Sequence, residues 1–383
     1  MSKTENAFAV IHFGSNVKYF ELELYFCIML RQNTSQNIIY MYSETDTPAS
    51  FVEQIKPFVY KTIGFNDQGI TYNVTAFESK YTSFNTLRTC DFIFAYKFLT
   101  NYKKVCIIES DLVLMGNIDS IFQLNTPSIV CYKCGEANLN KNLRYTSDKE
   151  QIIQDCDNSG VNGGIMLIEP SIQLFDEYIK AVPIIANRGC KYPNEALFEY
   201  VNNVYYNLPV KYNLSHYHTL RLSQYGLNPD GRDILVYHFN ETDFKHLDII
   251  KDGWLKANIN DPKVMSKYRL KKLPIMYFES TIYEPNKKRV NEILANLNKP
   301  QTQTQAQIPI KEVGSKKSDW VEAFSKTHNR PYWSNKVTKE SVWKKPNELL
   351  GGKKTKRKQP NKKRKNTKQT TNKRKYTNKK SRK

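Results

Sequence analysis

Two carboxylates stand one residue apart where an apolar segment ends. The segment covers residues 105–108, and Glu109 and Asp111 follow it in the stretch CIIESDLVLMGNIDSIF. Side chains at positions i and i+2 of a strand share a face, so both carboxylates can point at one site. A pair beyond the carboxyl end of a strand lies where open α/β sheets bind ligands, and its hard oxygens suit Mn²⁺ or Mg²⁺. The alternative is a solvated acidic pair or a helix cap.

Three further features favour the same chemistry. His238 ends the apolar segment ILVYHF, and imidazole is an acceptable third ligand for Mn²⁺. Lys245 follows seven residues later and supplies a point charge for a phosphate. Asn162 and two glycines, Gly163 and Gly164, precede another apolar segment, where glycine permits a close backbone approach. Each feature has a plain alternative: a packed histidine, a surface lysine and an ordinary turn.

The elements that must position these residues alternate along residues 1–298. We expect strands over 7–13, 37–43, 103–110, 163–171 and 233–239, and helices over 18–32, 47–59, 171–182 and 194–203. Thr47 is the predicted N-cap of its helix, with Pro48 at the first helical position. This alternation predicts an α/β fold with a mostly parallel sheet between helices. The segment 105–108 is apolar without alternation, as expected for a sheet covered on both faces.

The order of these motifs resembles a known family. The stretches AFAVIHF, ESDLVLMGNIDSIF, VNGGIMLIEPS, LPVKYNLS and LVYHF followed by a lysine look like those of the family-8 glycosyltransferases, the glycogenin and galactinol-synthase group. The resemblance covers about residues 7–250. It implies a single nucleotide-sugar-binding domain of the glycosyltransferase A type. It also implies a UDP-sugar donor, Mn²⁺ (or Mg²⁺) as cofactor, and transfer of a hexose with retention of anomeric configuration.

The resemblance assigns roles to individual residues. Glu109 and Asp111 match the two acids of the family's D-x-D metal motif, His238 matches its metal-binding histidine, and Lys245 matches the lysine near the donor diphosphate. Two further groups match positions around the donor. They are Ile11, Asn16 and Tyr19 around the uracil, and Asn162, Gly163 and Gly164 beside the donor sugar.

The sequence departs from the family pattern at three places. Glu109 is one methylene longer than the usual Asp. Asn194 and Glu195 stand where the family has Asp-Gln, and we predict that they are the catalytic residues. A family lysine upstream of the metal motif is replaced by Thr86, with Arg88 close by as a donor-binding candidate.

Residues 319–349 resemble a WW domain. Trp320 and Trp343 stand 23 positions apart, with PYWSN between them and Pro346 after them. The resemblance implies a small three-stranded β unit with an aromatic groove for a polyproline helix. Tyr332, Ser341 and Trp343 would line that groove, so a proline-rich peptide or protein is the expected partner. The alternative is that the aromatic residues form an ordinary core.

The net charge of +21 belongs to one end of the chain. Residues 353–383 contain 17 Lys or Arg and no acid, which leaves 41 basic and 37 acidic residues before them. We expect a polar linker at 299–318 and a disordered basic tail at 350–383. The tail suits nuclear localisation or binding of a polyanion such as nucleic acid, and the alternative is a solubilising tail.

Seven cysteines without a secretion signal predict reduced thiols and a cytoplasmic location, with the nucleus as an alternative through the tail. A zinc site at Cys131 and Cys134 with Cys156 or Cys190 is the less favoured alternative. No run is apolar enough for a membrane span. The sequence leaves open whether the protein forms a homodimer. The sequence therefore predicts a retaining UDP-sugar glycosyltransferase with a WW module. The alternatives are an inactive glycosyltransferase-like WW adaptor and a nucleic-acid-associated protein.

Overall fold

The computed structural model describes residues 5–66, 88–135, 138–158, 160–214, 227–228, 231–239, 246–251, 272–297, 320–325, 330–335 and 341–342. The chain divides into two compact units, Met1–Pro300 and Gln301–Lys383. The predicted linker and the predicted basic tail lie outside the described residues.

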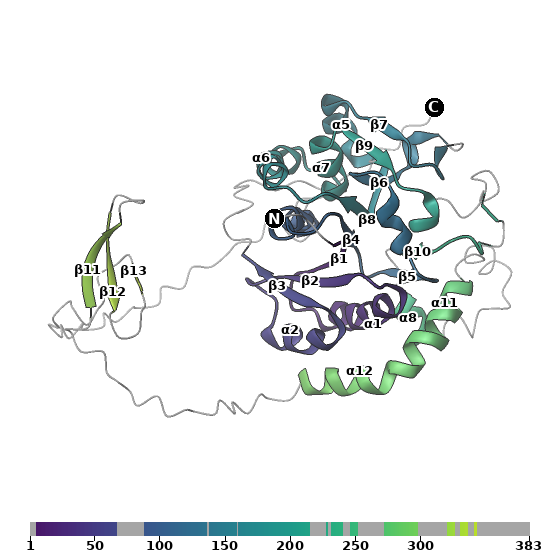
Figure 1. Cartoon of the computed structure of the whole chain (residues 1–383), viewed down its shortest axis with the longest axis horizontal. Helices are drawn as coiled ribbons and strands as arrows, with labels where there is room; N and C mark the ends of the chain where they lie inside the picture. The colour runs from purple at the N-terminus through teal and green to yellow at the C-terminus, as the bar shows by residue number, and fades with distance from the viewer. Residues whose placement is uncertain are drawn as a thin grey trace, which may run out of the picture. The chain divides into compact units, whose positions relative to one another are not determined.

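The first unit is built on an eight-stranded sheet (Figure 1). In spatial order its strands are β3 (Lys61–Phe65), β2 (Asn37–Ser43), β1 (Ala7–His12), β4 (Val105–Ile108), β8 (Val161–Ile168), β6 (Ser128–Cys131), β9 (Val204–Asn207) and β7 (Arg144–Thr146). The four strands from β3 to β4 are parallel, as are β6 and β9. β8 runs antiparallel to β4 and β6, and β7 runs antiparallel to β9. The predicted α/β fold with a mostly parallel sheet is confirmed, and β8 and β7 make the sheet mixed.

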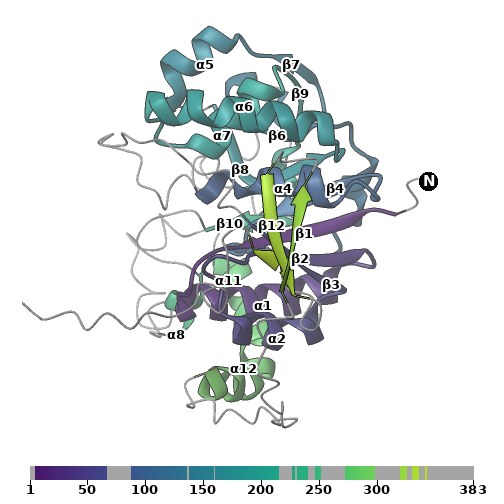
Figure 2. The ribbon, with the colours of Figure 1, turned by 90° about the vertical axis from the view of Figure 1, so that its left-hand side faces the viewer.

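Helices cover both faces of this sheet (Figures 1 and 2). One face packs against α1 (Val17–Asn33), α2 (Ala49–Ile55), α8 (His246–Lys251), α11 (Lys272–Phe278), the π-helix η11 (Glu279–Tyr283) and α12 (Glu284–Leu297). The other face packs against α4 (Ile93–Phe98), α5 (Lys149–Asp155), α6 (Ile172–Arg188) and α7 (Pro193–Val201). Successive residues of β1 alternate between the two cores, with Phe8 and Val10 in one and Ala7 and Ala9 in the other. This alternation follows from the period of two in a strand.

Short elements complete the unit. The 3₁₀ helices are η1 (Lys56–Phe58), η3 (Arg88–Phe92), η4 (Asp119–Gln123), η5 (Tyr132–Cys134), η7 (Cys156–Asn158) and η8 (Val210–Tyr212). A two-stranded antiparallel sheet joins β5 (Leu112–Leu114) to β10 (Val236–His238). This small sheet brings the segment after β4 beside a strand more than a hundred residues later in the chain.

The helices α2 and α6 differ most from their predicted bounds. The helix α2 begins at Ala49 with Pro48 as its N-cap, because the N–H groups of Phe51 and Val52 bond to the Pro48 carbonyl; the predicted cap at Thr47 is one residue too early. The helix α6 continues through Pro183 to Arg188 and ends at Gly189, which is left-handed. Burial of Ile185 and Ala186 in the core stabilises the extra turn beyond the proline.

The helix α1 is buried around most of its circumference. It carries two acids into the interior, Glu21 and Glu23, and both are paired. Glu21 forms an ion pair with Lys251, and Glu23 accepts a hydrogen bond of 2.7 Å from the Tyr40 hydroxyl. Within the described ranges, no helix has both the length and the apolar character that a membrane crossing needs.

The second unit contains a three-stranded antiparallel sheet of β11 (Trp320–Ser325), β12 (Arg330–Asn335) and β13 (Ser341–Val342). Trp320 pairs with Asn335 across the first two strands, and Ser334 pairs with Ser341 across the second two. The predicted small three-stranded β unit is confirmed.

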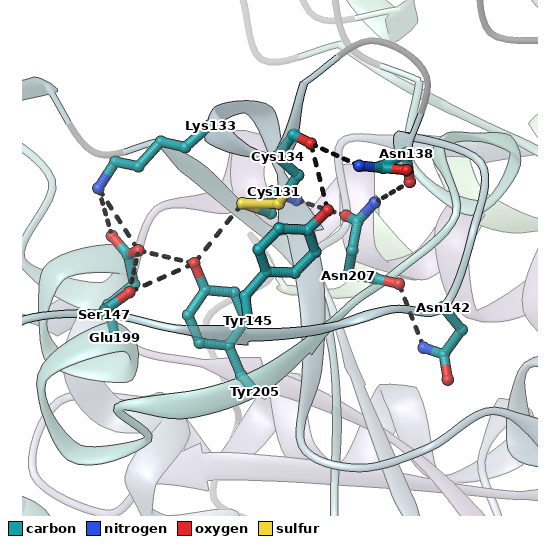
Figure 3. The surroundings of a disulfide bond; sticks show 10 residues. All are labelled: Cys131, Lys133, Cys134, Asn138, Asn142, Tyr145, Ser147, Glu199, Tyr205 and Asn207. Carbon is teal, nitrogen blue, oxygen red and sulfur yellow. Dashed lines mark hydrogen bonds and ion pairs between the residues drawn. A yellow bond between two sulfur atoms is a disulfide. The ribbon is translucent and has the colours of Figure 1, made fainter.

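The cysteines form two disulfides. Cys131 bonds to Cys134 and Cys156 to Cys190, while Cys27, Cys90 and Cys106 are free and buried. The prediction of reduced thiols is wrong for the four bonded cysteines, whose sulfurs are also not available as thiolate ligands for zinc. Figure 3 shows the first disulfide beside the Tyr205 hydroxyl, which lies 3.6 Å from Cys131 Sγ and donates to Glu199 Oε1. The second joins residues 34 positions apart, with β8 and α6 between them in the chain.

Candidate functional site

The ends of three strands bring Glu109, Asp111 and His238 together. The Glu109 N–H donates to the Gly164 carbonyl at 3.0 Å, which extends the pairing of β4 with β8 by one residue. Asp111 precedes β5, and the pairing of β5 with β10 sets Leu112 opposite His238. The backbone ladders thus place both acids beside a histidine far away in the sequence.

The three side chains face one another at short range. His238 Nε2 lies 3.3 Å from Asp111 Oδ1 and 3.4 Å from Glu109 Oε2. One ligand atom from each residue falls within 4.8 Å of the other two. His238 and Asp111 are buried, whereas the Glu109 side chain is 43% exposed. The cluster therefore opens to solvent on the side of Glu109.

Two asparagines fix the orientation of the imidazole. His238 Nδ1 lies 3.0 Å from Asn162 Oδ1 and 3.1 Å from Asn213 Oδ1. Asn162 Oδ1 also accepts hydrogen bonds from Asn213 Nδ2 at 2.7 Å and from the Gly164 N–H at 3.1 Å. Because both partners of Nδ1 are acceptors, Nδ1 carries the proton, and in the neutral ring the Nε2 lone pair faces the two carboxylates.

This donor set fits a divalent cation. Among the residues that the structure describes, His238 Nε2 is buried without a hydrogen-bond partner, although it lies 3.3 Å and 3.4 Å from two carboxylate oxygens. Two carboxylate oxygens and one imidazole nitrogen suit Mn²⁺, and Mg²⁺ less closely. Burial lowers the pKa of His238, but Asp111 and Glu109 outweigh it and raise the pKa to about 9. A cation that binds Nε2 would therefore displace a proton.

Two glycines of β8 form a narrow platform beside the cluster. A Cβ on Gly164 would lie 2.5 Å from Cε1 of His238, and a Cβ on Gly163 would lie 2.7 Å from Nδ2 of Asn194. The Gly163 N–H donates to Glu195 Oε1 at 3.0 Å. The platform thus connects the predicted catalytic residues of α7 to His238. A side chain at Gly164 would have to displace the His238 ring, whereas one at Gly163 would meet the ends of the Asn194 and Met166 side chains.

The other predicted donor-binding residues that the structure describes lie at the carboxyl end of β1, at the start of α1 and in η3. Ile11 is half-buried in β1, Asn16 caps α1 by accepting from the Lys18 N–H at 3.0 Å, and Tyr19 is 55% exposed. Arg88 is buried and forms ion pairs with Asp46 and Asp91. Lys245 lies outside the described residues.

Sequence reasoning missed two polar residues that the structure places in these networks. Asn213 lies within the stretch LPVKYNLS, which served only as a mark of family resemblance, yet its side chain contacts both Asn162 and His238. Asp46 follows β2 and contacts Arg88. No local pattern marks either residue, because their partners are distant in the sequence.

The antiparallel sheet of the second unit coincides with a match to a known domain. Residues 316–346 match the family model described as the WW domain. The chain contains a WW domain. Within the WW domain, Tyr332 lies in β12 and Ser341 in β13, and Trp343 is outside the described residues.

No curated protein sequence matches the chain. Solved structures similar to it include the bifunctional glycosyltransferase WbbM (12% identity, TM-score 0.45), the galactosyltransferase LgtC in complex with donor and acceptor sugar analogues (12%, 0.43) and GlyE of Streptococcus pneumoniae (16%, 0.40). These matches cover 70%, 74% and 73% of this chain, and 52%, 99% and 64% of the respective structures. The chain thus spans about half the length of WbbM. A likeness at this level says nothing of the donor or the acceptor.

Proposed function

We propose that residues 1–298 form a metal-dependent glycosyltransferase that moves a hexose from a UDP-sugar to an acceptor with retention of configuration. The observation that supports this proposal best is the cluster of Glu109, Asp111 and His238 at the carboxyl end of β4. The family resemblance of the surrounding motifs supplies the donor class and the stereochemical outcome.

The topology supports a ligand site at this place. From β1 the chain adds β2 and β3 on one side of the sheet, and β4 then pairs on the other side of β1. Because β1 and β4 are neighbouring parallel strands, their carboxyl ends lie at the same edge of the sheet, which is where open α/β sheets bind ligands. The acids follow β4, and Asn16 and Tyr19 follow β1, so a nucleoside diphosphate suits this edge.

Each group of residues has a proposed part in the reaction. A divalent cation held by Glu109, Asp111 and His238 would stabilise the negative charge that develops on the departing diphosphate. Asn162 and Asn213 keep the His238 ring turned toward the carboxylates. Lys245 is the proposed point charge for the diphosphate.

Asn194 and Glu195 are the proposed catalytic residues. Both lie against Gly163, which follows directly on Asn162, the residue that contacts His238. Glu195 is the carboxylate of this pair. It is the proposed nucleophile if retention proceeds through a covalent intermediate, whereas a same-face attack by the acceptor would need it only for orientation.

Hydrolysis of a panel of UDP-sugars by the full chain, with and without Mn²⁺, tests the enzyme. We expect release of UDP that requires Mn²⁺ and that Asp111→Asn abolishes, while Glu53→Gln on the exposed side of α2 releases UDP like the wild type. A wild-type chain that binds UDP but hydrolyses no UDP-sugar, even with a proline-rich acceptor added, would instead support the inactive WW adaptor. The Glu109 and Asn194 departures from the family pattern are what favour that second candidate.

The WW domain is proposed to bring proline-rich partners to the transferase unit, where they serve as acceptors. Tyr332, Ser341 and Trp343 are the proposed groove residues. Titration of a proline-rich peptide should show binding that Trp343→Ala abolishes. Equal binding by the variant would contradict a groove at this position.

A further inference from the structure

The loop between β1 and α1 contacts the last residue of β1 and groups from two other segments. The Gly14 N–H donates to Asp46 Oδ1 at 2.9 Å. The Gly14 carbonyl accepts from His12 Nε2 at 2.9 Å. The Phe13 ring lies 5.1 Å from the guanidinium carbon of Arg88, a cation–π distance. Gly14 has a φ of +88°, which favours glycine, so the loop has a defined backbone shape.

Arg88 connects this loop to two other segments. Its Nη1 donates to Asp46 Oδ2 at 3.0 Å and its Nε donates to Asp91 Oδ2 at 2.9 Å. Asp46 follows β2, and Arg88 lies in η3. Arg88 and Asp91 are both buried, whereas the Asp46 side chain is 38% exposed. Because the guanidinium is planar and rigid, its contacts with two carboxylates and a ring fix the relative positions of three segments.

These contacts differ from those of a residue that reaches a ligand. The charge of Arg88 is engaged by two protein carboxylates, and its side chain is covered by the protein. The loop that it contacts leads directly into Asn16, the cap of α1, and into the exposed Tyr19. The contacts of Arg88 with Phe13 and Asp46 therefore connect it to the shape of this loop.

We infer that Arg88 and Asp46 are positioning residues that hold residues 13–16 in the shape that accepts the nucleoside of a nucleoside diphosphate. The inference rests on the proposed function, which sets the nucleoside at the carboxyl end of β1. The Asp46 carboxylate contacts both the Gly14 N–H and the Arg88 guanidinium, so it connects the shape of the loop to Arg88. A loop fixed before binding loses less conformational freedom when the ligand binds, and this preorganisation increases affinity.

Asp46 is the residue to change, because truncating Arg88 would remove an ion-pair partner of the buried Asp91 and would strongly destabilise the fold. Asp46→Ala removes both acceptor oxygens, whereas Asp46→Asn keeps one oxygen for the Gly14 N–H and loses the charge that faces Arg88. Glu53→Ala, which breaks an exposed ion pair with Lys56, is the matched control.

Isothermal titration of the full chain with UDP and with inorganic pyrophosphate, both in Mn²⁺, tests the inference. We expect Asp46→Ala to weaken UDP binding about tenfold, which is the size of effect that lost preorganisation of one loop can produce, and to leave pyrophosphate binding unchanged. Asp46→Asn should be intermediate, and the control should match the wild type. A thermal melt confirms that each variant is folded.

The outcomes separate the inference from the proposed function. If the wild type binds UDP and Asp46→Ala binds it equally well, the inference is wrong and the proposed function stands. Equal weakening of UDP binding and pyrophosphate binding would also overturn the inference. Pyrophosphate lacks a nucleoside, so a residue that acts only on the nucleoside subsite cannot change its affinity. A wild-type chain that binds pyrophosphate as tightly as UDP would contradict both the inference and the proposed function.

Discussion

His238 connects the two halves of the candidate site through its two ring nitrogens. Nε2 faces the carboxylates of Asp111 and Glu109, and Nδ1 faces the amide oxygens of Asn162 and Asn213. Such contacts behind a metal ligand keep its ring oriented, and their loss commonly weakens metal binding by about ten- to a hundredfold. The orientation of one ring therefore depends on residues from three separate segments.

Gly164 controls the position of that ring. We predict that Gly164→Ala lowers Mn²⁺ affinity by about tenfold or more, because the new methyl carbon would lie 2.5 Å from Cε1 of His238 and must displace the ring. Overpacking should also reduce the free energy of unfolding by about 1–3 kcal/mol. Manganese titration followed by electron paramagnetic resonance measures the first effect, and urea denaturation the second.

Gly116→Ala is the control for this change, since a Cβ at Gly116 would meet no heavy atom within 4 Å. Unaltered Mn²⁺ affinity in Gly164→Ala would show that the cation does not use His238 in this orientation.

His12 gives the free energy of unfolding a pH dependence. Burial lowers its pKa, but Glu23, whose Oε2 lies 2.7 Å from His12 Nδ1, together with the Gly14 carbonyl and Asp46, raises the pKa above the ordinary 6.5. The folded chain thus holds this proton more tightly than the unfolded chain. The stabilisation is complete below pH 6.5 and is lost as the pH rises through the folded pKa.

We predict that His12→Gln removes this dependence. Urea denaturation between pH 6 and pH 9, in metal-free buffer, should show that the difference in unfolding free energy between wild type and variant shrinks as the pH rises. The other groups that face His12, including Tyr40, are present in both proteins. Parallel curves would contradict a protonated His12 in the folded state.

One disulfide connects elements that carry residues of the candidate site. Cys156–Cys190 joins η7, which precedes β8, to the segment ahead of α7. Gly163 of β8 and Glu195 of α7 contact each other a few residues beyond this bond. The disulfide therefore connects the two elements whose ends meet at the glycine platform.

We predict that the double change Cys156→Ser with Cys190→Ser lowers the free energy of unfolding by about 2–4 kcal/mol, because the bond closes a loop of 34 positions in the unfolded chain. Removing Cys131–Cys134, which closes a loop of three positions, should cost less on the same entropic ground. Urea denaturation with and without a thiol reductant measures both. A reductant that destabilises the double variant as much as the wild type would contradict the prediction.

Most of the net positive charge of the chain lies in its last residues, outside the globular part. Its net charge is +21, while the residues before 353 carry 41 basic and 37 acidic side chains. We predict that any non-specific binding to nucleic acid resides in residues 353–383 and weakens on the order of a thousandfold between 50 and 200 mM salt, as expected when several phosphates are neutralised. Fluorescence anisotropy with a labelled duplex measures this. Undiminished binding after deletion of 353–383 would indicate a basic surface elsewhere.

Much of the fold follows from local patterns in the sequence. The strand β2 covers the predicted residues 37–43, and α1 exceeds its predicted range by one residue at each end. These patterns are readable because strands repeat every two residues and helices every 3.6. The WW domain is equally visible, since its aromatic spacing lies within a short stretch. Glu109, Asp111 and His238 also stand out in the sequence, because packing of the core gives no reason for polar residues at the ends of apolar segments.

The tertiary structure decided what connects distant residues. Asn162 contacts Asn213 across 51 positions and His238 across 76, Arg88 contacts Asp46 across 42, and Cys156 reaches Cys190 across 34. The antiparallel direction of β8 and the pairing of the cysteines likewise depend on contacts between distant segments. A local pattern records only which face of its own element a side chain occupies. Which elements then become neighbours depends on how the whole sheet and its two helical layers bury their apolar faces together.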